Sequence, residues 1–283
     1  MPSNAMVYKS NALIEASFRL SVPEQRILLA CIAQVRRDAP LTDDVWYSVT
    51  AQDIAQLSGN AVEATYSELK EAAIKLRRRE VSIPEEPNGG GKLPDVLVTG
   101  WVQSIIPRKG LGRVDLRFNK DMIPYLSELT KQFTKYALAD VAKMSSAHAI
   151  RLYEVLMQWA SVGRCEVEIA RLRDWLQLED RYSMLADFKR YVIDSSLEQI
   201  NKHSPLAVTY TQRKTGRFVT HLIFTFKHKP TKAVKANPVS KALPAKEERL
   251  YGYPVSLLEK HRQYADEPLE DVVPRMVKVA AEA

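Results

Sequence analysis

Apolar residues recur at three- and four-residue steps in several stretches of the chain, the pattern of helices that bury one face. The first such stretch follows Ser21, a favourable N-cap, and Glu24 three residues later completes a capping box. A short helix is predicted over Asp53–Leu57, with Thr50 as its N-cap. A longer helix is predicted over Ala61–Arg79, where the apolar stripe is regular and the opposite side mixes both charges.

Two runs that suit strands follow the longer helix. Val96–Ile106 and Val114–Phe118 flank a basic turn, Pro107–Gly110, and predict a β-hairpin. A glycine-rich loop, Asn88–Gly91, precedes the hairpin, and Trp46–Val49 predicts a short strand earlier in the chain. This part of the chain therefore combines helices with a basic-tipped hairpin.

The later part of the chain has the same order of elements. The pattern predicts a helix, a polar turn, a second helix and two strands, over Glu168–Leu176, Glu179–Arg181, Ser183–Ile193, Leu206–Gln212 and Arg217–Phe226. The strands are joined at Lys214–Gly216. Helix, turn, helix and basic hairpin is the order of a winged helix, in which the second helix enters a DNA groove.

The two halves repeat one another. Ser21 and Ser145 each open an apolar helix, and Val49 and Val167 each precede a short helix. We therefore predict an α+β protein of two tandem winged-helix domains with a flexible C-terminal extension. The predicted domains are residues 8–125, residues 126–228 and a linker and tail over residues 229–283.

Charge favours a polyanionic partner. The 283 residues carry a formal net charge of +7. From Lys202 to Lys232 the chain has Lys and Arg residues but no Asp or Glu, and this stretch includes the predicted second hairpin. A hairpin this basic suits a phosphate backbone better than a protein core, so we predict binding to double-stranded DNA.

Chemistry-bearing groups are sparse. Cys31 and Cys165 are far apart in sequence, which fits a reducing cytoplasm, and the five histidines form no pair at metal-ligand spacing. Gly89–Lys92 is no Walker loop, because Glu86 and Leu93 replace the required glycine and hydroxyl residue. We predict no catalytic residue, metal or cofactor. The N-terminus has no signal-peptide core and no stretch approaches about 20 apolar residues, so we expect a cytoplasmic protein without a membrane partner.

The second helix of the later half predicts which residues face DNA. On an ideal helix Leu185, Phe188 and Val192 form a buried stripe, and Arg190 projects from the opposite side. Arg190 is the best candidate for a base edge, because a guanidinium can bind guanine O6 and N7 together. Asp187 either accepts from a cytosine amine or orients Arg190. The full set of predicted DNA-binding residues is Arg181, Tyr182, Ser183, Asp187, Lys189, Arg190, Arg213, Lys214 and Arg217, with Arg77, Arg78, Arg108 and Lys109 in the first half.

Several motifs occur in the order found in the iteron-binding plasmid replication initiators, which the chain resembles over residues 8–228. They are Ser10–Ala16, Arg19–Ser21 and Glu24–Arg26 in the first half, and Phe133-Thr134 with Tyr136, Ser145-Ser146, Ala149–Glu154, Asp187–Arg190 and Lys214–Arg217 in the second. Family members often carry a basic residue just before the Asp187–Arg190 run, where this chain has Ser183–Ala186.

The resemblance implies partners that the residues alone do not reveal. It implies that the second domain supplies most base contacts at direct repeats in the origin, and that the first also forms a homodimer. It implies that monomers open the origin and recruit the host replicative helicase and initiator proteins, and that dimers bind an operator inverted repeat to repress the protein's own gene. Two other functions stay open on the sequence: a winged-helix transcriptional regulator, and a tyrosine recombinase or relaxase.

Overall fold

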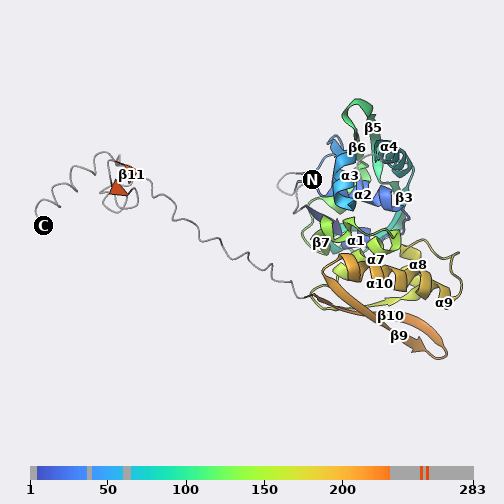
Figure 1. The fold of residues 1–283 in the computed structure, drawn as a ribbon. Coiled ribbons are helices and arrows are strands. Elements are labelled where there is room, and N and C mark those ends of the chain that lie inside the picture. The colour runs from blue at the N-terminus through green and yellow to red at the C-terminus, as the bar shows by residue number, and fades with distance from the viewer. Residues whose placement is uncertain (1–4, 37–39, 60–64, 230–248, 251–252, 255–283) are drawn as a thin grey trace, which may run out of the picture. The chain divides into compact units, whose positions relative to one another are not determined.

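The computed structural model describes residues 5–36, 40–59, 65–229, 249–250 and 253–254 (Figure 1). The described residues up to Lys229 form one compact unit. Beyond it, β11 (Arg249–Leu250) pairs antiparallel with β12 (Tyr253–Pro254). The predicted linker after Lys229 and the predicted tail otherwise lie outside the described residues. Among the described helices, none combines the length and apolar character needed to cross a membrane.

The described part of the first half begins with two strands and four helices, and two of these helices start at the N-caps that the sequence predicts. The elements are β1 (Met6–Ser10), α1 (Asn11–Ile14), α2 (Val22–Ile32), β2 (Tyr47–Thr50), α3 (Ala51–Ser58) and α4 (Thr65–Leu76). The capping box of Ser21 and Glu24 at the start of α2 is confirmed. Thr50 caps α3, and Gly59 ends it in the left-handed conformation with φ of 72°.

The prediction of one helix over residues 61–79 was wrong at its end. Residues 61–64 lie outside the described residues, and α4 ends at Leu76. The reason is the chain reversal into β3 (Glu80–Glu85), which leaves Arg77 and Arg78 exposed in the turn. These arginines therefore follow the helix and do not extend its face.

The single predicted strand Val96–Ile106 is divided in two. β4 (Lys92–Gly100) pairs with β3, whereas β5 (Val102–Arg108) pairs with β6 (Arg113–Phe118), which also pairs with β2. The chain changes partner at Trp101, a fully buried side chain whose ring meets Phe18 edge-on at 4.7 Å between centroids. Burial of this indole in the core explains why the strand is interrupted there.

The second half repeats the order of the first. Its elements are β7 (Phe133–Ala137), α6 (Leu138–Ala142), α7 (Ala147–Met157), β8 (Arg164–Glu168), α8 (Ile169–Trp175), α9 (Leu185–Phe188), a π-helical turn (Lys189–Asp194), α10 (Ser195–His203), β9 (Leu206–Thr215) and β10 (Phe218–His228). Strand β10 lies between β8 and β9 in a three-stranded sheet. The N-cap of α7 is Ser146, one residue beyond the predicted Ser145. Each half thus has the winged-helix order.

The two halves share a ladder and a core. Strands β1 and β7 pair antiparallel, from Met6 opposite Ala137 to Ser10 opposite Phe133. The buried apolar side chains of both halves form one continuous cluster. A pair of strands alone is marginal in water, so the halves stabilise each other through this shared core.

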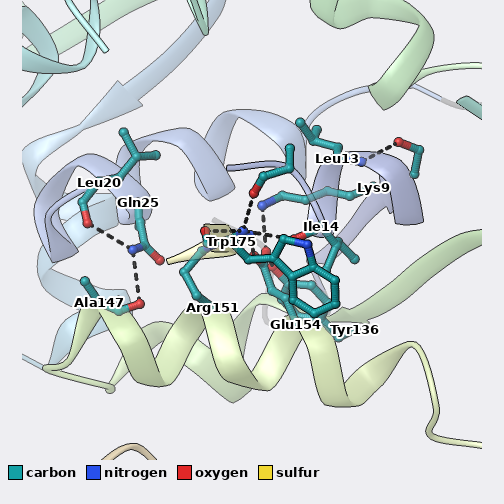
Figure 2. A network of polar contacts seen from close by, with 12 residues as sticks. Lys9, Leu13, Ile14, Leu20, Gln25, Tyr136, Ala147, Arg151, Glu154 and Trp175 are labelled. Atoms are coloured by element: carbon teal, nitrogen blue, oxygen red, sulfur yellow. Dashed lines mark hydrogen bonds and ion pairs between the residues drawn. The ribbon is translucent and has the colours of Figure 1, made fainter. Parts of the chain in front are cut away.

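A buried polar network also crosses between the halves (Figure 2). Glu154 of α7 accepts from Lys9 Nζ of β1 at 2.6 Å and from Tyr136 OH of β7 at 2.5 Å. Arg151, one helical turn earlier, lies 3.2 Å from the same carboxylate. Its Nη2 donates to the carbonyl oxygens of Ile14 and Ala16, both at 2.9 Å. The second half is thereby hydrogen-bonded to the backbone of the first.

Candidate nucleic-acid interface

A single long helix dominates the second half. Segments α9, the π-helical turn and α10 are continuous, because the residues at both junctions have right-handed helical backbone angles. We call residues 185–203 the composite helix. It begins at Leu185, two residues after the predicted start, and continues ten residues beyond the predicted end at Ile193. The structure therefore corrects both bounds.

The buried stripe of the composite helix is confirmed. Phe188 and Val192 are buried, and Leu185 is half-buried against the core. The π-helical turn adds Ile193, which is fully buried beside Val192. A π turn widens the helix by one residue, so neighbouring side chains can both face inward. Such turns occur frequently at functional sites.

The opposite face is solvent-exposed. Arg190 is exposed and forms no hydrogen bond or ion pair with the described residues; its guanidinium lies 5.3 Å from the ring centroid of Tyr191. Tyr191, the next residue along the helix, is 52% exposed. Asp187 and Lys189 are half-buried, and Ser183 is exposed before the helix begins. A free guanidinium on a rigid helix suits base recognition.

Arg173 shapes the turn that leads into the composite helix, a role that was not predicted. Its guanidinium donates to the backbone oxygens of Arg181 at 2.7 Å and Tyr182 at 2.6 Å, and lies 4.4 Å from the ring centroid of Phe188. Tyr182 adopts φ of 54°, and its ring stacks on that of Tyr191. No local sequence signal identifies Arg173, because its partners lie in a loop of irregular conformation.

The second hairpin carries free cations at its tip. Gly216 and Arg217 form the turn, with φ of 62° at Gly216, and Lys214 and Arg217 are exposed without a partner among the described residues. Arg213 differs from them, because it forms an ion pair with Glu166 of β8. Phe218, beside the turn, is 78% exposed. The tip therefore presents two cations and an aromatic ring to solvent.

A side-chain contact connects the hairpin to the composite helix. Tyr210 of β9 donates to Asp194 at 2.9 Å. Burial, together with the hydrogen bond and charge of Asp194, raises the pKa of Tyr210 to about 12, so the phenol stays protonated and donates at neutral pH. The helix and hairpin are thus held in a fixed relation, as a joint DNA-binding surface requires.

The predicted residues of the first half lie apart from those of the second. Arg108 and Lys109 are at the tip of the β5–β6 hairpin, at the opposite end of the compact unit from the β9–β10 tip (Figure 1). Arg108 pairs with Asp115 at 3.0 Å, and Arg77 donates to the Gln103 carbonyl at 2.7 Å. Two separate groups of cations thus occur, one on each half.

Within the described residues, no group of three or more His, Cys, Asp and Glu side chains is arranged to hold a metal ion. Both cysteines are buried, and burial raises the pKa of the Cys31 and Cys165 thiols. Buried thiols of this kind are poor nucleophiles at neutral pH.

Comparison with known proteins identifies relatives over most of the compact unit. The family profile "Initiator Replication protein, WH1" matches residues 6–157, and "Initiator Rep protein, WH2" matches residues 168–226. An Escherichia coli sequence described as "Uncharacterized 27.6 kDa protein" is 30% identical over 77% of this chain and 93% of its own length. A "Replication initiation protein" of Escherichia coli is 24% identical over 78% of this chain and 69% of its own length.

Two further similarities concern Pi proteins. The "PI protein" of Escherichia coli is 23% identical over 76% of this chain and 80% of its own length. The crystal structure of the Pi initiator protein in complex with iteron DNA superimposes with a TM-score of 0.68 at 19% identity, over 81% of this chain and 99% of that one. The structural likeness establishes a shared fold of tandem winged helices.

Proposed function

Because this chain belongs to the initiator replication protein family, with a WH1 and a WH2 domain, we propose that it initiates plasmid replication by binding direct repeats at the origin. The observation that carries the proposal is the exposed, unpaired Arg190 on a composite helix that is fixed beside a basic hairpin. The fold shared with a Pi initiator solved on iteron DNA supports it. The test is affinity for the direct repeats beside the coding region; equal affinity for scrambled duplexes would contradict it.

We propose different roles for the residues of the second half. Arg190 contacts base edges, whereas Arg181, Tyr182, Ser183 and Lys189 hold the sugar-phosphate backbone. Asp187 forms no ion pair with Arg190 among the described residues, so it orients that guanidinium only when DNA is bound. Lys214 and Arg217 bind phosphates from the hairpin tip, where both are free. Arg213 joins them only if its ion pair with Glu166 opens.

Lys214→Ala is expected to weaken binding to repeat and scrambled duplexes by the same factor. A phosphate contact carries no sequence information, and each one contributes roughly one unit to the slope of log affinity against log salt. The measurement is fluorescence anisotropy with both duplexes at several salt concentrations. The control is Lys227→Ala, an exposed cation on the same hairpin but far from its tip. An unchanged salt slope for Lys214→Ala would argue against the phosphate contact.

The first domain serves chiefly in dimerisation under this proposal. The exposed side of α4 alternates charge, and Lys75 pairs with Glu71 there at 2.6 Å, so it suits a DNA groove poorly. Arg77, Arg78, Arg108 and Lys109 add auxiliary backbone contacts. We propose that dimers bind an operator inverted repeat and that monomers bind the origin and recruit the host helicase and initiator proteins. The proposed division at residue 125 falls within α5 (Ile123–Leu126), before the second repeat begins at β7.

Dissociating the dimer is expected to increase binding to a single direct repeat, because the proposed dimer interface covers surface of the first domain. Sedimentation across a range of concentrations would give the association state, and anisotropy at the same concentrations would give the affinity. Monomer at every concentration, or dimers that bind single repeats as well as monomers do, would contradict the dimer proposal.

We also propose that the protein acts in the cytoplasm without a catalytic step of its own, by binding and deforming DNA. Deformation of a duplex costs energy that additional protein contacts offset. The family is one of DNA-binding initiators. A covalent protein–DNA adduct on a denaturing gel, lost when one tyrosine is changed, would contradict this assignment.

A further inference from the structure

A cavity of about 340 Å³ lies between the two halves of the compact unit. Its first-half lining comes from the segment before α2, from the start of α2 and from the turn after α4, and its second-half lining comes from the start of α7 and the end of α8. The polar side chains that line it are Arg19, Ser21, Gln25, Arg79, His148 and Arg151. No carboxylate is among the lining residues.

The positive charge at this cavity is only partly neutralised by buried carboxylates. Arg79 pairs with the buried Glu24 at 2.9 Å, and Arg151 pairs with the buried Glu154. Arg19 is exposed at the cavity and forms no hydrogen bond or ion pair with any described residue. Its charge is therefore available to an incoming anion.

Arg151 offers a second unsatisfied donor. Its side chain is 3% exposed, and its two terminal nitrogens are engaged by carbonyl oxygens and Glu154. Its Nε is buried without a hydrogen-bond partner among the described residues. A buried donor that lacks a partner costs free energy, which a bound acceptor would recover.

His148 lies in the same lining and responds to the local charge. Burial lowers the pKa of His148, and the neighbouring charges of Arg19 and Arg181 lower it further. Arg181 belongs to the proposed DNA-binding set, so this cluster extends that surface toward the cavity. Helices α2 and α7 also begin at the cavity, and the N-terminal ends of their dipoles favour an anion.

We propose that this cavity is a phosphate-binding site shared by the two winged helices, with Arg19 as the principal charged ligand and His148 and Arg151 as supporting donors. The ligand is a phosphate group, either in the DNA backbone that passes between the two domains or in a free phosphate or monoester. A phosphate bound by residues of both domains would fix the relative orientation of the domains when DNA is bound. The proposal that the phosphate belongs to the DNA backbone rests on the proposed function, whereas the proposal that the cavity binds a phosphate group does not.

Inorganic phosphate is the first probe, added to the full-length protein at constant ionic strength. The imidazole signals of His148, assigned with His148→Gln, are followed by NMR across a pH titration. Phosphate is expected to raise the pKa of His148 by about 1 or more, since an adjacent negative charge favours the imidazolium. Arg19→Gln is expected to weaken this phosphate response about tenfold. Arg164→Gln, which removes an exposed arginine outside the cavity, should leave the response unchanged.

A repeat-bearing duplex is the second probe and identifies the source. If the DNA backbone supplies the phosphate, Arg19→Gln weakens binding to the repeat and scrambled duplexes by the same factor. It also reduces the slope of log affinity against log salt concentration by about one unit. If DNA binding is unchanged but the phosphate response depends on Arg19, the site takes a free phosphate or monoester. The proposal is overturned if His148 does not respond to phosphate and Arg19→Gln leaves DNA binding unchanged. Failure of the wild-type protein to prefer the repeats would instead contradict the proposed function and leave the phosphate experiment intact.

Discussion

Glu154→Gln is expected to lower the free energy of unfolding by about 3–5 kcal/mol, the loss that follows removal of one partner from a buried ion pair. Glu154, Lys9 and Arg151 are all at most 3% exposed. The glutamine keeps the shape of the side chain but leaves two buried cations without a counter-charge. Chemical denaturation at neutral pH would measure the change, and a loss comparable to that of a surface substitution would contradict it.

The pH dependence of this stabilisation has a defined sign. Burial by itself would raise the pKa of the Glu154 carboxyl, but the charges of Lys9 and Arg151 and the hydrogen bonds from Lys9 and Tyr136 outweigh it and lower the pKa. A lowered carboxyl pKa stabilises the folded state above the ordinary glutamate value of about 4.3. The difference in the free energy of unfolding between wild type and Glu154→Gln should therefore have its full value at pH 7. It should become smaller as the pH falls below about 4.

Two variants distinguish the loss of the buried counter-charge from an unspecific loss of stability. Glu71→Gln removes an equally short ion pair, with Lys75, from the exposed side of α4 and should leave stability unchanged, because solvent screens that pair. Lys9→Met added to Glu154→Gln removes one of the two uncompensated cations and should restore part of the loss. If the double variant were less stable than Glu154→Gln, the explanation by unpaired charge would fail.

Arg190→Ala is expected to reduce discrimination between the direct repeat and a scrambled duplex by about 1–3 kcal/mol, the value of a good bidentate base contact. Arg190 is exposed, unpaired and carried by the composite helix, so its loss should not disturb the core. Affinities for both duplexes, measured at the same salt concentration, give the ratio directly. An unchanged ratio would mean that base recognition comes from another face.

Lys202→Ala is the matched control for Arg190→Ala. Lys202 is an exposed cation in the last turn of the same composite helix, so its removal changes the net charge equally without altering the Arg190 face. It should reduce affinity for both duplexes slightly and leave their ratio unchanged. A second comparison, Arg173→Lys, tests whether Arg173 positions the start of the composite helix. Lysine lacks the planar guanidinium that donates to the backbone oxygens of Arg181 and Tyr182 in the turn before that helix.

Local features of the fold follow from the sequence alone. The capping boxes at Ser21 and Thr50 satisfy backbone donors within three residues, so they form wherever their helices form. The burial of Phe188 and Val192 follows from helical periodicity. The repeated order of elements likewise predicts the tandem winged helices without any contact between the halves.

Features that join distant parts of the chain were decided only by the tertiary structure. Lys9 and Glu154 are 145 positions apart, and no local pattern indicates that the two form a buried pair. The interruption at Trp101 and the π-helical turn that buries Ile193 depart from the expected periodicity, and the hydrogen bonds from Arg173 to the predicted polar turn have no local signal. In each case packing or hydrogen bonding to another part of the chain decided the structure, because an element's own residues set its local preference but not what it contacts in the folded chain.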